Sequence, residues 1–299
     1  MTGFTLQARS WMVLVFLALS AVATQVGLEG RIVTPAVPST VAWVQSPTLM
    51  RRLTLGFNTI WADVYWIRTV QYFGGTRLAK NPQKSYERLY PLLDITTTLD
   101  PRFNIAYRLG AILLSEGSSN GTGNTGQAIA LLEKGMREMP EKWQYPLDAG
   151  FIVYWWGRDP AAAAQWFLKA ESRPGAPNWI RPVAAAMLTQ GGERAAARAM
   201  WYELATNSDH EWLRRAGRRG LMQVDAEAHI EVLAPVILQF HERFGRFPAN
   251  WKEVVAAGLL RRMPVDPTGH MYALDPTTGS IDVDPRSQLY PLRQKGAGR

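Results

Sequence analysis

At 299 residues, 47% of them hydrophobic, the chain can bury a sizeable core and is not a disordered protein. It has no cysteine, which excludes disulfides, thiolate metal sites and cysteine nucleophiles, and its four histidines form no H-x-x-x-H pair. The formal charge of +8 would suit nucleic-acid binding, but the densest basic cluster, residues 214–219, lies in no recognisable nucleic-acid module. It is interpreted as a solvated helix face, with attraction to anionic lipid headgroups as the alternative. No metal, cofactor or nucleic-acid partner is therefore predicted.

Residues 1–28 are expected to form a signal-anchor or transmembrane helix. Residues 11–28 carry no charge, follow a short stretch that contains Arg9, and reach the roughly 17 to 25 residues that a spanning helix needs. Arg9 would stay cytoplasmic, so the segment predicts a single-pass bacterial inner-membrane protein that contacts lipid through this helix, with its bulk in the periplasm. The small residues before Thr24 leave a second interpretation open, export after signal cleavage near Ala23.

A linker and then a long helical region are expected next. Residues 29–48 hold three prolines and no helical period, which is typical of a linker. Over residues 49–225, helix-length segments alternate with short breakers such as Asp100-Pro101, and no strand pattern occurs, so the fold is predicted to be mainly α. Helices are expected near residues 50–74, 83–98, 102–116, 125–138, 141–156, 160–172, 177–190, 192–206 and 209–222.

The helical region has an internal period. Small residues recur thirty-five apart, at Gly135, Ala170 and Ala205. In the preceding helices an aromatic residue is followed seven residues later by a small one: Phe103 and Gly110, Trp143 and Gly150, Trp179 and Ala186. Small residues let neighbouring helices approach, and the aromatic residues fill the gap between helix pairs.

This period resembles the tetratricopeptide repeat over residues 83–208. The resemblance implies an α-solenoid with a concave groove for a peptide or a partner helix. Two departures from the pattern stand out: Arg198 occupies a position where a small residue is expected, and the spacing between first helices drifts from 40 to 36 residues.

Aromatic residues supply the candidate binding positions, because they are frequent anchors at interfaces. The segment 53–75 is apolar around most of its circumference, so it must be buried or meet a partner or lipid. Packing between stacked helices is the alternative role for each aromatic residue. The candidate partner-binding residues are Trp61, Tyr65, Trp143, Trp155 and Trp179.

Residues 226–290 are predicted to form a small α+β unit, followed by a disordered basic tail over 291–299. A helix is expected over 226–244, with Gly245 as its stop and Asn250 as the N-cap of a second, short helix. Two strand patterns joined by a turn, "HMYAL" and "SIDV", predict a β-hairpin.

The order of these elements over residues 230–283, with "GRFP" and "MPVDPTG", is similar to the soluble part of type II secretion major pseudopilins. The pilin stalk helix with its processing site is missing at this point, and the calcium cage of that family is not recognisable. Four aspartates could supply oxygen ligands but are interpreted as turn residues. They are Asp266, Asp275, Asp282 and Asp284.

Together these features predict a non-enzymatic, membrane-anchored protein–protein interaction scaffold on the extracytoplasmic side. It would support the assembly or stability of an envelope complex, of the pilus or secretion kind. The stretch around "LDPRFNIAY" also resembles a group of bacterial membrane-anchored repeat proteins, which implies the same layout of anchor and repeats. An accessory structural subunit of a membrane bioenergetic or photosynthetic complex is the alternative. No catalytic residue is predicted. Asp63, expected to be buried, is the one candidate for a perturbed acid, and helix capping or pairing with Arg68 is the favoured role for it.

Overall fold

The computed structural model describes residues 16–17, 19–20, 23–24, 46–79, 84–117 and 121–292. The chain divides into two units, Met1–Ser46 and Pro47–Arg299. The described residues of the first unit before Ser46 are helical, and the Ser20 hydroxyl donates a hydrogen bond of 2.8 Å to the Phe16 carbonyl. The expected linker up to residue 45 and the tail from residue 293 lie outside the described residues.

The expected placement as a single-pass inner-membrane protein is contradicted. Within the described residues, no helix combines the length and the apolar character needed to cross a membrane. A span takes about 20 apolar residues in one helix. The two long helices of the described chain carry several charges each, and the predicted segment 11–28 is described at only a few positions.

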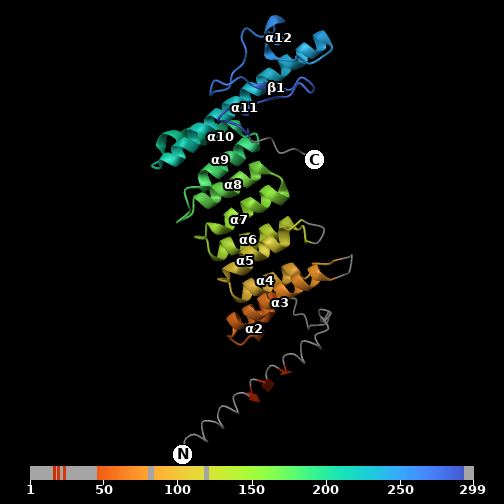
Figure 1. Ribbon diagram of the computed structural model, residues 1–299. Helices are drawn as coiled ribbons and strands as arrows, with labels where there is room; N and C mark the ends of the chain where they lie inside the picture. The colour runs from red at the N-terminus through yellow and green to blue at the C-terminus, as the bar shows by residue number, and fades with distance from the viewer. Residues whose placement is uncertain are drawn as a thin grey trace, which may run out of the picture. The chain divides into compact units, whose positions relative to one another are not determined.

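The second unit is mainly helical, as predicted, with a two-stranded sheet near its end (Figure 1). Its helices are α2 (Pro47–Leu53), α3 (Asn58–Leu78), α4 (Leu89–Leu99), α5 (Asn104–Ser115), α6 (Thr125–Glu138), α7 (Gln144–Ile152), the π-helical turn η1 (Val153–Gly157), α8 (Pro160–Glu171), α9 (Ile180–Gln190), α10 (Arg194–Asn207), α11 (Glu211–Phe244) and α12 (Trp251–Ala256). Its strands are β1 (Ala273–Leu274) and β2 (Ile281–Asp282).

Two helices replace the single helix expected over residues 50–74. The chain turns between α2 and α3, where Leu55 and Gly56 have φ values of 50° and 92°. A left-handed backbone cannot continue a right-handed helix, so α2 ends before this turn. Asp63, expected to be buried, lies exposed on α3 because the apolar faces of that helix are only partly covered.

Each α-helix from α3 to α10 packs against the next one in the chain, and α5 also contacts α7 (Figure 1). The small residues predicted at helix contacts do lie there. A Cβ atom on Gly110 of α5 would stand 2.6 Å from Leu93 Cδ2, and one on Gly150 of α7 would stand 2.7 Å from Phe167 Cε1. Larger residues at these glycine positions would push the neighbouring helices apart.

Arg198, which replaces an expected small residue, forms an ion pair with Asp225 of α11. Ala128 of α6 and Ala163 of α8 occupy the equivalent positions in the two preceding helix pairs, and both are fully buried. The last helix pair therefore departs from the pattern where it meets the long helix α11.

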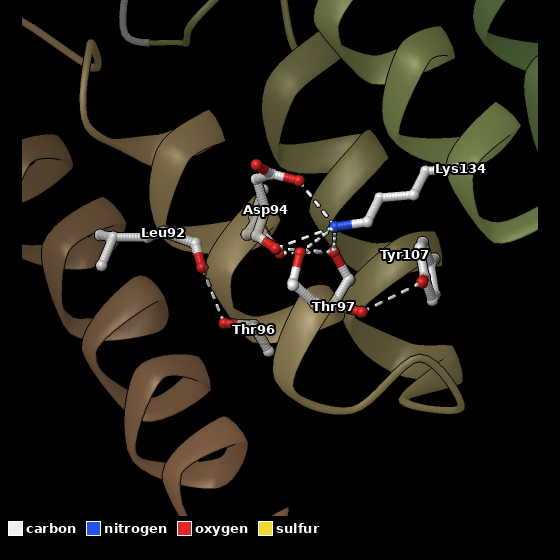
Figure 2. Close-up of polar contacts among 8 residues, drawn as sticks. Leu92, Asp94, Thr96, Thr97, Tyr107 and Lys134 are labelled. Carbon is white, nitrogen blue, oxygen red and sulfur yellow. Dashed lines mark hydrogen bonds and ion pairs between the residues drawn. The ribbon is translucent and has the colours of Figure 1, made fainter. Parts of the chain in front are cut away.

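A lysine of α6 binds the C-terminal end of α4 (Figure 2). The Lys134 ammonium donates hydrogen bonds to Asp94 Oδ1 (2.6 Å), Thr97 Oγ1 (2.9 Å) and Thr98 Oγ1 (2.6 Å). It also lies 2.9 Å from the Asp94 carbonyl oxygen, and cations stabilise helix C-termini. The Lys134 side chain therefore joins α6 to α4.

The helix α11 is continuous through residues 223–225, where a break between two helices was expected, and through Pro235. It ends at Gly245 (φ 68°), the predicted stop. Asn250 caps α12 as predicted, accepting hydrogen bonds from the backbone N–H groups of Lys252 (3.0 Å) and Glu253 (3.3 Å). The predicted hairpin is present, with β1 antiparallel to β2.

One apolar core joins the second half of α11 to α12, the hairpin and residues 289–292. Its Leu292, only 7% exposed, belongs to the segment expected to be a disordered tail, so the ordered unit extends at least that far. The buried members of this core are Ala226, Leu233, Ile237, Phe240, Trp251, Val254, Tyr272, Val283, Leu289 and Leu292.

Candidate partner-binding groove

A groove runs over α9, between η1 on one side and α11 on the other. Its cavity volume is about 680 Å³, within the roughly 300 to 1,000 Å³ of typical ligand sites. The lining side chains are mainly apolar, with an arginine and two glutamines among them. They are Tyr154 of η1, Pro182, Val183, Ala186, Met187 and Gln190 of α9, Trp201 of α10, Ala216, Arg219 and Gln223 of α11, and Pro291 near the chain end.

The α9 side of the groove follows from helical periodicity. Val183, Ala186, Met187 and Gln190 recur at intervals of three or four residues, which places them on one face of the helix. Ala186 and Met187 are buried, whereas Val183 and Gln190 are partly exposed. The groove therefore has a packed floor and an edge that a ligand can reach.

The indole of Trp201 is held in the floor by α11. Gly217 and Gly220 of α11 face α10, and a Cβ atom on Gly217 would stand 2.4 Å from the backbone nitrogen of Ala205. The Trp201 Nε1 donates a hydrogen bond of 3.2 Å to the Thr189 hydroxyl of α9. Because the ring is 6% exposed and hydrogen-bonded, it forms a rigid surface rather than a mobile one.

The end of the C-terminal unit forms one wall of the groove. Pro291 lines the groove, while Leu289 and Leu292 on either side are buried in the core of that unit. A smaller depression of about 280 Å³ adjoins this wall. Its lining residues are Arg215, Arg218, Arg219, Met222, Gln288 and Leu289.

The charges along this part of α11 are unevenly paired. Arg214 and Arg218 both bind Glu211, at 2.7 Å and 2.8 Å, and their hydrogen bonds hold the pKa of that carboxyl below its usual range. Arg219 lines both the groove and the smaller depression. The residue cluster interpreted from sequence as a solvated face thus includes two paired arginines and one that borders an apolar groove.

None of the five predicted aromatic residues lines this groove. Trp155 is 58% exposed beside Tyr154 and stacks on Phe151 with ring centroids 4.9 Å apart. Trp179, 39% exposed, directly precedes α9, and Trp143, at the start of α7, packs against the core.

The other two predicted residues lie together on α3, outside this region. Trp61 is 37% exposed. Tyr65 is 4% exposed, and its hydroxyl lies 3.5 Å from Met50 Sδ. Sequence reasoning missed the groove residues Val183, Arg219 and Pro291, because they come from three separate elements and share no local pattern.

A further depression, near the N-terminal end of α9, is more polar. It has a volume of about 280 Å³ and contains Arg181, which forms ion pairs with Glu171 (3.2 Å) and with Glu203. The two glutamates occupy the terminal nitrogens of Arg181, whereas its buried Nε has no hydrogen-bond partner among the described residues.

Three of the four aspartates singled out in the C-terminal unit serve its turns, whereas Asp282 lies in strand β2. Asp266 accepts hydrogen bonds from the backbone N–H groups of Thr268 (2.8 Å) and His270 (3.0 Å). Asp275 accepts one from Thr277 N (2.8 Å), and Asp284 accepts one from Arg286 N (2.8 Å). Within the described chain, no group of three or more His, Cys, Asp or Glu side chains is placed to hold a metal ion.

Comparisons of the chain with protein-family models, with curated proteins and with solved structures found no match.

Proposed function

We propose that this protein is a non-enzymatic interaction scaffold, in which the groove over α9 receives an apolar segment of a partner protein. The carrying observation is the groove itself, an open cavity of about 680 Å³ whose lining is mainly apolar. Segments that dock in such grooves bury apolar side chains on a preformed surface, which limits the conformational entropy lost on binding.

In this proposal the helices from α4 to α10 are tetratricopeptide-like repeats. Support comes from the packing of successive helices, from the contact of α5 with α7, and from the close approaches at Gly110 and Gly150. The proposal treats the C-terminal unit as a pseudopilin-like module, supported by the order of a helix, a corner and a hairpin along its chain. Its part in the scaffold would be to close the groove with the segment around Pro291.

The identity of the partner would determine which assembly the scaffold serves. An envelope complex of the pilus or secretion kind remains the proposed setting, and it rests on the resemblance of the C-terminal unit.

Peptide selection tests the groove directly. A phage-displayed library of random peptides would be selected against the full chain, and the enriched peptides would be synthesised and titrated by fluorescence anisotropy. Gln190→Trp adds a large side chain at the edge of the groove without changing a core residue, because Gln190 is partly exposed at the end of α9. We expect it to weaken peptide binding by about tenfold or more.

The matched control is Gln165→Trp, at an exposed position of α8 that does not line the groove. It should bind the peptides as the wild type does. If the two variants bind equally well, or if no peptide is enriched, the groove is not a docking site.

A further inference from the structure

We propose that the groove selects partner segments that place an acidic residue next to apolar ones, with the carboxylate bound by Arg219 and Arg215. This inference rests on the proposed docking function and adds the chemistry of the partner.

The first observation is the place of Arg219. Its side chain borders the apolar groove and also the adjoining depression, so a segment lying in the groove passes this guanidinium. Arg215 lies one helical turn away on α11 and lines the same depression. Both arginines are exposed, which leaves their guanidinium groups accessible to a ligand.

The second observation is the pairing of the arginines around them. Arg214 and Arg218 share Glu211, and Arg198 binds Asp225. Among the residues that the structure describes, neither Arg215 nor Arg219 forms an ion pair or a side-chain hydrogen bond. Glu211 and Asp225 are therefore paired with other arginines, whereas the two arginines at the groove have no acidic partner among the described residues.

A carboxylate suits this arrangement. Two like charges one turn apart on a helix repel each other, and an anion between them removes that repulsion. Arginine binds carboxylates through paired N–H donors, and such bonds strengthen beside apolar surface, where water is scarce. Met222 and Leu289 supply apolar surface in the depression, and the Gln288 amide adds a polar group.

The basic chain end is a poor occupant of the same place. Arg293, Lys295 and Arg299 follow the wall residue Pro291, and their positive charges would meet the two free arginines. Charge complementarity therefore favours an acidic segment of another protein.

The test uses the peptides selected on the full chain and a second set in which every Asp and Glu is replaced by Asn and Gln. We expect the enriched peptides to combine apolar residues with at least one acidic residue. Arg219→Glu should weaken binding of the acidic peptides by about tenfold and leave their amide counterparts within about twofold. Arg215→Glu should act in the same direction, and added salt should weaken binding of the acidic set only.

The control is Arg262→Glu, which makes the same change of charge at an exposed position that lines neither the groove nor the depression. It should bind both peptide sets as the wild type does. If Arg219→Glu and Arg262→Glu behave alike, or if the selected peptides show no excess of acidic residues, the inference about the carboxylate is overturned while the groove stands. If Gln190→Trp does not change peptide binding, the groove is not the docking site, whatever the charge of the peptides.

Discussion

The Trp201 indole of α10 lies against Gly220 of α11, so closely that a Cβ atom on Gly220 would stand 2.2 Å from Trp201 Cδ2. Gly217, three residues earlier on the same helix face, meets the backbone of Ala205 in the same way. These two contacts hold α11 against α10 and fix the ring that forms part of the groove floor. The packing of the last helix pair and the shape of the groove therefore depend on the same residues.

Replacing Gly220 by alanine should destabilise the protein. The added methyl group has no room against a ring that is itself hydrogen-bonded, and overpacking of this kind typically costs about 1 to 3 kcal/mol. Urea unfolding would measure the loss. Gly74→Ala is the control, since α3 leaves no neighbouring heavy atom within 4 Å of that Cβ. It should stabilise by about 0.5 to 1 kcal/mol, as alanine does in an open helix. Equal effects of the two substitutions would contradict the close contact at Gly220.

Lys134→Met should loosen the junction of α4 and α6 (Figure 2). The variant removes the cation that Asp94 and two threonine hydroxyls share, at a site where the lysine side chain is 18% exposed. Because Asp94 is 33% exposed and can be rehydrated, we expect a loss of about 1 to 2 kcal/mol rather than the cost of a fully buried charge. Amide hydrogen exchange should accelerate in the last turn of α4. The exposed Lys252 provides the control: Lys252→Met should change neither quantity, and a similar loss there would show that charge alone is responsible.

Local signals predicted most helices well. The bounds of α6 match the prediction, because Asn124 caps it, accepting a hydrogen bond from Gln127 N, and Pro140 follows its end. The break between α2 and α3 was missed because only one glycine, Gly56, marks it in the sequence. The preceding Leu55 adopts a left-handed conformation that leucine does not favour. The continuity of α11 was missed because the change of composition near residue 226 was interpreted as a boundary, although residues 223–225 contain no helix breaker.

The groove could not be predicted from local sequence signals. Tyr154, Val183, Arg219 and Pro291 come from η1, α9, α11 and the chain end, and only tertiary packing brings them together. One hint was present in the sequence. Gly217 and Gly220, spaced by three within a basic stretch, indicate a helix face that packs closely, which a fully solvated face does not need.

The stability of the C-terminal unit should depend on pH through Asp266. Burial raises the pKa of this carboxyl, but hydrogen bonds from Ser287, Thr268 and the backbone N–H of His270 outweigh it, so the pKa lies below its ordinary value. A lowered pKa in the folded state contributes stability above the unfolded pKa of about 3.9, and this stability is lost as the pH falls through the folded value.

Asp266→Asn should therefore be less stable than the wild type at pH 7, and the difference should shrink in acid as the wild-type carboxyl takes up its proton. Thermal unfolding between neutral pH and the acid range would follow both proteins. Asp209→Asn, at an exposed position before α11, is the control for the loss of one negative charge and should unfold at the same temperature as the wild type at pH 7. A difference at Asp266 that stays constant with pH would mean that the lost hydrogen bonds, not the charge, carry the effect.

The wall of the groove can be tested separately from its floor. Leu289 is fully buried in the core of the C-terminal unit and also lines the depression beside Arg219, whereas Val254 is fully buried in the same core but lines neither cavity. Truncation of either residue leaves a cavity, at a cost of about 2 to 5 kcal/mol for a buried leucine and less for valine. At a temperature where both variants remain folded, Leu289→Ala should weaken binding of the selected peptides by about tenfold, and Val254→Ala should leave it within about twofold. If the two variants bind alike, the C-terminal unit does not contribute to docking, and the groove is a property of the helical array alone.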